Sequence, residues 1–310
     1  MHNPKKNTNF AGKIKNKVFI RKMTQFLING LITGVLYSLL AIGFALVYNT
    51  TKIFHIAAAA LYVVAAYAFY VFAVKLGLPL VLAFALATIF TMLISLGTEY
   101  GVYQPLKKRK ASLNVTMIAS IGLMTVLVNL VAMIFGNETK VIDNTIQPTF
   151  SFADIIITTP QMYQLVGGAA IIVAFMLFLS LSRFGLKLRA LSTDDDLFAT
   201  MGYSINRTRT YVFLLSGLFI SVASCLTVYD VGLDPHMGMN VLINAMVAMI
   251  IGGIGRFGTC VLGGLILGVL QSLVVYQFAS NWQNAITFVL LLILLFLRPQ
   301  GIAGYKQRTV

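Results

Sequence analysis

Long stretches without charged residues constrain the fold of this chain more than any other feature. A helix needs about 20 apolar residues to cross a bilayer. The last stretch is too long for one helix, and Ser280-Asn281-Trp282 is its natural break. The sequence therefore predicts an all-α, polytopic integral membrane protein with eight to nine transmembrane helices. The uncharged stretches cover residues 25–51, 53–74, 76–98, 111–136, 161–182, 210–229, 235–255 and 257–297.

The distribution of Lys and Arg predicts which loops face the cytoplasm, because cytoplasmic loops are rich in these residues. The net charge is +14, but the basic residues lie in tails and loops, so no nucleic-acid partner is expected. The loops predicted inside are 107–110, 183–209, Arg256 and 298–308. Those predicted outside are 138–160, 230–234 and Asn281.

The first 22 residues do not fit this scheme. They carry seven Lys and Arg, which predicts a cytoplasmic tail, whereas the three apolar segments before Lys107 place them outside. Either segment 53–74 enters the membrane and returns on the same side, or Met23 is the true start and nine segments cross. In the second interpretation, residues 1–22 are a basic tail that lies upstream of the start.

The stretch 183–209 is the longest polar interruption of the apolar body. Its middle predicts a short helix with a cap, acidic residues in the first turn and a terminating glycine, at Thr193, 194–196 and Gly202. Leu197, Phe198 and Met201 lie near one face of this helix. Such a loop either rests on lipid headgroups or docks on a soluble partner.

This loop resembles the cytoplasmic coupling loop of branched-chain amino acid ABC permeases, the LivH/LivM family. The resemblance rests on Gly185, Arg189, Ala190, Asp194 and Gly202, which follow the pattern G-x-x-x-R-A, then D, then G. The family continues G-I-N, whereas this chain has Gly202-Tyr203-Ser204. In the family, the loop docks on the ATPase subunit.

The C-terminal end carries the resemblance further. Arg298-Pro299-Gln300-Gly301 is similar to the family's R-P-x-G, and the whole resemblance runs from Met23 to Gly304. It implies a basic tail over 1–22, a permease domain over 23–304 with its coupling loop at 183–209, and a cytoplasmic tail over 305–310.

Residues 48–62, YNTTKIFHIAAAALY, place several polar groups beside a membrane segment. Polar groups are costly in lipid, so they should face protein or water. His55 is either part of a wet loop or marks a discontinuity in the translocation path. Family members often continue with I-A-H-G-A; this chain keeps Ile56-Ala57 and then has Ala58 and Ala59, without the His and Gly.

Glycines crowd the stretch 249–268. Gly252-Gly253-Ile254-Gly255 punctuates a short segment, which is a pointer to a transport site. It resembles the family's G-G-x-G-S/T-x-x-G, with Arg256 in place of the small residue. Close helix packing is the alternative interpretation, and it is the one expected for the G-x-x-x-G pairs at 30/34 and 264/268.

Several functions lack their motifs. No Gly-Lys-Ser/Thr occurs, so a P-loop nucleotide site is excluded. Three histidines and two cysteines form no metal-ligand or catalytic set, so no metal, no cofactor and no enzymatic activity are predicted. No acid lies within a span, which weakly disfavours an ion-coupled carrier.

The resemblance therefore implies a permease subunit of an ATP-binding cassette importer in a bacterial inner membrane. It would move branched-chain or related amino acids by alternating access, with separate ATPase subunits, a second permease subunit and an extracytoplasmic binding protein. The residues predicted for coupling are Arg189, Asp194, Phe198, Met201 and Gly202, and those for the path are His55, Gly252, Gly253 and Gly255. A self-sufficient carrier or channel and a structural membrane subunit are the alternatives.

Overall fold

The computed structural model describes residues 5–143, 147–152, 155–193, 195–297 and 301–302. Within these ranges, seven helices are long and apolar enough to cross a membrane, and two apolar helices, Met237–Gly252 and Trp282–Leu294, are shorter. The nine helices coincide with the nine apolar segments of the sequence. The predicted class of polytopic membrane protein is therefore confirmed.

Twelve α-helices and two π-helical segments make up most of the described chain. The π-helical segments η1 (Val71–Lys75) and η2 (Glu99–Tyr103) directly follow α2 and α3. The α-helices are α1 (Lys5–Thr51), α2 (Ala58–Tyr70), α3 (Leu80–Thr98), α4 (Gln104–Lys108), α5 (Leu113–Phe135), α6 (Thr159–Leu181), α7 (Arg183–Thr193), α8 (Asp195–Thr200), α9 (Ile205–Val231), α10 (Met237–Gly252), α11 (Thr259–Gln277) and α12 (Trp282–Leu297).

A small β-hairpin accompanies the helices. Strand β1 (Thr149–Phe152) pairs antiparallel with β2 (Ile155–Thr158), and Thr149 lies opposite Thr158. The aromatic, Ile and Thr residues of these strands favour the extended conformation. Strands of four residues are too short to form an apolar stretch of membrane length.

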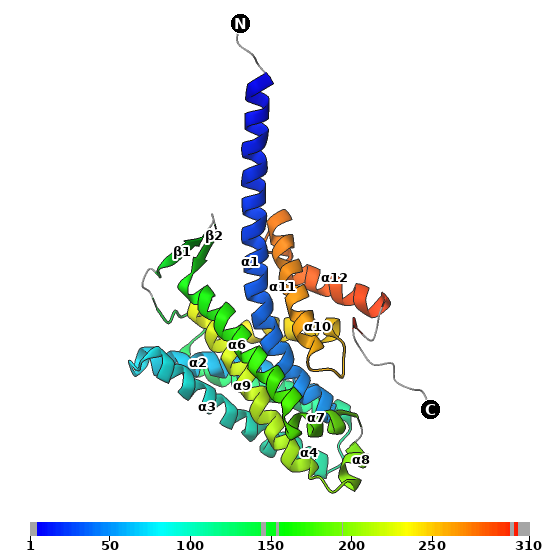
Figure 1. The fold of residues 1–310 in the computed structure, drawn as a ribbon. Coiled ribbons are helices and arrows are strands. Elements are labelled where there is room, and N and C mark those ends of the chain that lie inside the picture. The colour runs from blue at the N-terminus through cyan, green and yellow to red at the C-terminus, as the bar shows by residue number, and fades with distance from the viewer. Residues whose placement is uncertain (1–4, 144–146, 153–154, 194, 298–300, 303–310) are drawn as a thin grey trace.

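Helix α1 forms the centre of the body, and 89% of its most apolar 18-residue stretch is buried. Figure 1 shows it passing beside α11. A Cβ on Gly268 would collide with the backbone of Gly34, and one on Gly264 would collide with Ser38. Because small residues let helices approach closely, the predicted packing role of these glycines is confirmed.

One end of the body, here called the outer end, gathers the loops predicted outside. The Gln25 side chain donates to the Ile156 carbonyl (2.8 Å) and accepts from the Ile156 amide (3.0 Å) of β2. Lys140 and Leu233 exchange two backbone hydrogen bonds of 2.9 Å, which joins the 138–160 and 230–234 loops. The start of the Met23–Thr51 span thus lies beside the external hairpin.

The opposite, inner end holds the loops predicted inside. Figure 1 shows α4, α7 and α8 there, away from the hairpin. Lys52 Nζ donates to the Ser192 carbonyl (3.1 Å), so the end of α1 reaches α7. Because α1 starts at the outer end and Lys107 lies at the inner end, an odd number of crossings separates them. This geometry supports a crossing, rather than a re-entrant, 53–74 segment.

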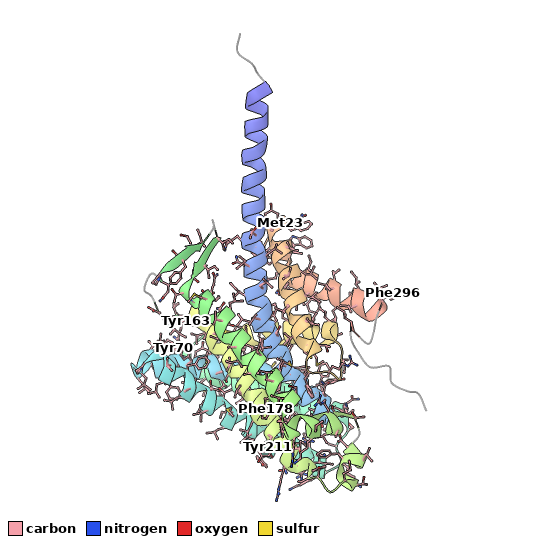
Figure 2. All side chains as sticks on the ribbon, viewed as in Figure 1. Met23, Tyr70, Tyr163, Phe178, Tyr211 and Phe296 are labelled. Carbon is pink, nitrogen blue, oxygen red and sulfur yellow. The ribbon has the colours of Figure 1, made fainter. Side chains whose placement is uncertain are left out.

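Helix α1 continues beyond the body at the outer end. Figure 2 shows Met23 at the level where α1 leaves the other helices. The helix has 47 residues, or about 70 Å at about 1.5 Å per residue, against a hydrocarbon thickness of about 30 Å. Residues 5–22 therefore extend past the membrane-spanning part.

Candidate functional site

The inner end carries a projecting element that we call the arm, made of α7, α8 and Gly202. Gly185 lies so close to the Leu179 carbonyl that a Cβ would overlap it. Arg189 Nε donates to the Gly185 carbonyl (3.3 Å) and Nη2 to the Leu179 carbonyl (3.4 Å). A guanidinium suits the free carbonyls at a helix C-terminus. The G-x-x-x-R spacing therefore fastens the arm to the end of α6.

Two features of the predicted short helix need correction. Residues 183–193 are helical, so the arm has two helices rather than one. Thr193 is the last residue of α7, and its hydroxyl donates to the Arg189 carbonyl (2.9 Å). Asp194 lies outside the described residues. Gly202 does end α8, with φ at +80°.

The predicted contact face of α8 also differs. Phe198 is only 1% exposed and stacks on Tyr203 with ring centroids 5.2 Å apart. Lys187 Nζ lies 4.9 Å from the centroid of the same Tyr203 ring. Leu197 and Met201 are 59% and 64% exposed. Phe198 thus belongs to the arm's own small core, and Leu197 and Met201 form its outer apolar surface.

The connection between α1 and α2 lies directly beside the arm. Lys52 ends α1 in the left-handed conformation, with φ at +57°, which is unusual for a residue with a side chain. Its ammonium group donates to the carbonyls of Asn49 (3.0 Å) and Ser192 (3.1 Å). One cation therefore binds the C-terminal ends of both α1 and α7, where positive charge is favourable.

His55 lies in the same connection and is fully buried. Its Nδ1 hydrogen-bonds the Tyr103 hydroxyl (2.7 Å), which hydrogen-bonds Ser120 Oγ (2.8 Å). Ser120 Oγ in turn accepts from the Ala57 amide (2.9 Å). Burial lowers the pKa of His55 to about 3, and its Nε2 has no hydrogen-bond partner among the residues that the structure describes. A neutral imidazole therefore fixes the connection against η2 and α5.

The predicted glycine cluster forms the turn from α10 to α11. Gly253 and Gly255 have φ of +106° and +99°. The Gly255 amide donates to Asn49 Oδ1 (3.2 Å), and a Cβ on Gly252 would collide with the Thr259 carbonyl. The Ile302 amide donates to the Ile251 carbonyl (3.0 Å). The structure thus brings this turn, the α1–α2 connection and the C-terminal segment together at the inner end.

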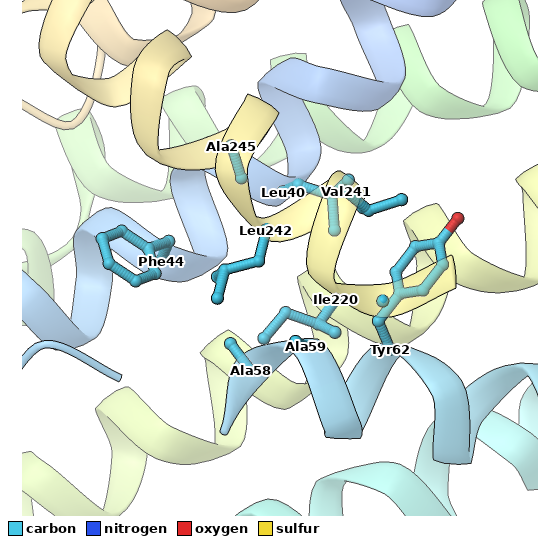
Figure 3. A pocket seen from close by; sticks show the side chains of 10 residues that line it. Leu40, Phe44, Ala58, Ala59, Tyr62, Ile220, Val241, Leu242 and Ala245 are labelled. Atoms are coloured by element: carbon cyan, nitrogen blue, oxygen red, sulfur yellow. The ribbon is translucent and has the colours of Figure 1, made fainter. Parts of the chain in front are cut away.

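A small apolar void lies between α1, α2, α9 and α10. Figure 3 shows Leu40, Ala58, Ala59, Tyr62 and Leu242 around it. Its volume is about 10 Å³, close to the smallest space that holds one water molecule. The void is therefore closed to any amino acid, and the alanines that replace the family's His and Gly line it.

Sequence reasoning missed two buried polar groups. Glu99 and Arg209 form an ion pair with N–O distances of 2.7 and 3.0 Å. Farther along the membrane, neutral side chains of α1, α10, α11 and α12 hydrogen-bond to one another: Tyr37, Asn244, Gln271, Gln283 and Thr287. Isolated Asn and Gln residues within apolar stretches are the signal that identifies the second group. In the described ranges, no group of three or more His, Cys, Asp or Glu could hold a metal ion.

Comparison with known proteins identifies the family. The family model described as "Branched-chain amino acid transport system / permease component" matches residues 26–295. The chain belongs to this family. The chain is thus a multi-pass permease of the inner membrane.

Known permeases are similar in sequence to this chain over most of its length. The high-affinity branched-chain amino acid transport system permease protein BraD of Pseudomonas aeruginosa is 29% identical over 297 residues, which cover 91% of this chain and 96% of BraD. LivH of Escherichia coli, named likewise, is 25% identical over 298 residues, covering 91% and 96%. The probable branched-chain permease LivH of Methanocaldococcus jannaschii is 26% identical, covering 87% and 90%.

A solved structure shares the fold. PsaBC from Streptococcus pneumoniae in complex with Fab aligns with a TM-score of 0.52 and 16% sequence identity. The alignment covers 89% of the permease and 92% of that chain. At this identity the likeness concerns the arrangement of helices alone.

Proposed function

We propose that this permease is the membrane subunit of an ATP-binding cassette importer for branched-chain or related amino acids. Separate ATPase subunits drive alternating access, and an extracytoplasmic binding protein delivers the substrate. The names of BraD and LivH, which are branched-chain amino acid permeases, support the substrate class. The apolar lining of the void and its small size support a resting state in which the path is closed.

The observation that carries this proposal is the arm at the inner end. The side of the arm that faces the body is attached to α6 through Gly185 and Arg189 and to α1 through Lys52. The side that faces away from the body presents Leu197 and Met201, which lie outside the spans and are more than half exposed. A firmly attached element with an exposed apolar tip suits transmission of force from a soluble partner.

The predicted coupling residues have distinct roles in this proposal. Met201, together with Leu197, contacts the ATPase, and Asp194 contributes its carboxylate charge to coupling. Phe198 and Gly202 shape α8 from within, because one is buried and the other ends the helix. Arg189 holds the arm to the spans.

We place the inner mouth of the path at His55 and at Gly252, Gly253 and Gly255. His55 holds the α1–α2 connection against η2 through Tyr103, and the Gly255 amide of the glycine turn donates to Asn49 in the last turn of α1. A shift of α1 relative to α10 would open the void between them. The chain has Ala58 and Ala59 where the family has His and Gly, so the lining favours aliphatic over polar groups.

The proposed second permease subunit has a candidate contact face on α5. Only 11% of the apolar window of α5 is buried, the lowest value among the seven spans. Gly122, Thr125 and Asn129 follow one exposed side of the helix. Polar groups are unfavourable in lipid, so this side suits another protein chain or a water-filled path better than acyl chains.

The experiment that tests the proposal measures uptake of labelled leucine, isoleucine and valine in cells that lack this permease and every redundant system. Loss of uptake, restored by the permease gene on a plasmid, is the expected result. Uptake equal to that of the parent strain for all three amino acids would contradict the proposed substrate class.

A further inference from the structure

Glu99 and Arg209 form a buried ion pair near the inner end of the body. Arg209 Nε donates to Glu99 Oε1 (2.7 Å) and Nη2 donates to Oε2 (3.0 Å), and the two side chains are 4% and 3% exposed. Paired, bidentate contacts of this kind are strong and directional. Separating the partners would leave two unpaired charges in the protein interior, which is very costly. The two segments that carry them must therefore move together.

Arg209 connects this ion pair to the arm. Helix α9 begins at Ile205, three residues after Gly202 ends the arm. Ser204 caps α9 by accepting from the Arg207 amide (3.4 Å). Because capped helix follows the arm almost directly, a displacement of α8 acts on Arg209 through few flexible residues.

Glu99 connects the ion pair to the α1–α2 connection. It opens η2, and π-helical segments are rare and frequent at functional sites. Tyr103, at the end of η2, hydrogen-bonds His55 (2.7 Å), and the His55 and Phe213 rings lie 5.4 Å apart. In the ion pair, Arg209 is therefore connected to the arm, and Glu99 is connected through Tyr103 and His55 to the proposed mouth of the path.

Neutral hydrogen bonds also join α3 and η2 to α9 close to the ion pair. Ser95 Oγ donates to the Phe213 carbonyl (2.7 Å), and the hydroxyls of Tyr100 and Thr210 lie 2.8 Å apart. These bonds follow the same contact without charge. They provide controls that perturb the contact while the ion pair stays intact.

We propose that Glu99 and Arg209 are positioning residues for coupling, and that their ion pair carries motion of the arm to η2 and the α1–α2 connection. This inference rests on the function proposed above. The ion pair does not touch substrate or nucleotide. Its loss should therefore separate ATP hydrolysis from transport rather than abolish both.

The test uses the complete transporter, purified with its ATPase and second permease subunits and reconstituted in liposomes with its binding protein. ATP hydrolysis and leucine uptake are measured together for the wild type, Glu99→Gln, Arg209→Gln, the exchanged pair Glu99→Arg/Arg209→Glu, and the control Tyr100→Phe. We expect at least about a tenfold fall in leucine moved per ATP in each single variant, partial recovery in the exchanged pair, and less than about a twofold change in the control.

An unchanged ratio of leucine to ATP in the single variants would overturn the proposal. If hydrolysis and uptake are both retained, the ion pair has no role in coupling. If both fall in equal proportion, its role is structural alone. If the Gln variants do not accumulate, Arg209→Lys decides, because it keeps the charge and loses the bidentate geometry; a normal ratio there refutes the proposal. Absence of ATP-dependent uptake by the wild type would instead refute the proposed function, and this inference with it.

Discussion

The exposed apolar surface of the arm offers the sharpest test of coupling, because neighbouring residues of one short helix differ widely in how much of their side chain is exposed. Leu197 and Met201 are 59% and 64% exposed, whereas Phe198 is 1% exposed. Full burial of a Leu or Met side chain contributes about 1.5–3 kcal/mol. Covering the exposed parts of both residues would therefore contribute about 2–4 kcal/mol to ATPase binding.

We expect Leu197→Ser/Met201→Ser to weaken ATPase binding by about 30- to 700-fold, since about 1.4 kcal/mol corresponds to a tenfold change in Kd. The assay titrates purified ATPase subunits onto the permease held in lipid nanodiscs. Val231→Ser is the matched control, because Val231 is 72% exposed but lies at the outer end. An unchanged Kd for the double variant would refute docking through this surface.

Phe198 should behave differently from its neighbours. Phe198→Ala removes the contact with Tyr203, and Phe-to-Ala changes in a core cost about 3–5 kcal/mol. The arm itself should then lose order, which protease digestion of the 183–209 region would detect. Protection equal to that of the wild type would show that Phe198 does not hold α8 in place.

Three further predictions follow from the inner and outer ends. A reporter fused after Thr149 should signal the outer face and one after Arg209 the cytoplasm; a cytoplasmic signal at Thr149 would overturn the arrangement of spans. Lys52→Gly should be more stable than Lys52→Ala by about 1 kcal/mol, because glycine accepts positive φ without strain, and equal melting temperatures would contradict the left-handed end of α1. The pKa of His55 is lowered to about 3 in the folded protein. The stability that the buried, neutral imidazole contributes is therefore fully present above the unfolded pKa of about 6.5. Between about 6.5 and about 3 it falls by about 1.4 kcal/mol for each unit by which the pH decreases. Melting at pH 7.5 and 5.5 should show a smaller acid loss for His55→Gln, and equal losses would show that His55 is not buried neutral.

The membrane segments could be predicted from the sequence because a span needs a long uncharged stretch, and few alternatives satisfy that need. The break at Asn281 and the end of α8 at Gly202 were equally readable. The sequence did not show on which side of the membrane the first span begins. The basic residues before Met23 predict the cytoplasm, whereas the number of crossings before Lys107 predicts the outer face. The hydrogen bond of Gln25 with Ile156 places the start of the first span beside the hairpin at the outer end.

The site was less predictable for physical reasons. Two turns of helix give too little periodicity to show which of Leu197, Phe198 and Met201 faces inward. The sequence showed Thr193 only as a candidate cap, whereas in the structure it is the last residue of the eleven-residue helix α7 and donates to the Arg189 carbonyl. Glu99 and Arg209 are 110 positions apart, and no local pattern links them. Glu99 also stands at the edge of an uncharged stretch, where an acid normally faces water.

ATP-dependent uptake by the purified transporter tests the central claim most directly. The permease is isolated with the subunits that accompany it, placed in liposomes with its binding protein, and given labelled leucine with ATP or ADP on the ATPase side. Our account predicts leucine accumulation with ATP and the binding protein together, and none when either is withheld. Equal accumulation with ADP, or by the permease chain alone, would contradict it and identify a self-sufficient carrier or channel.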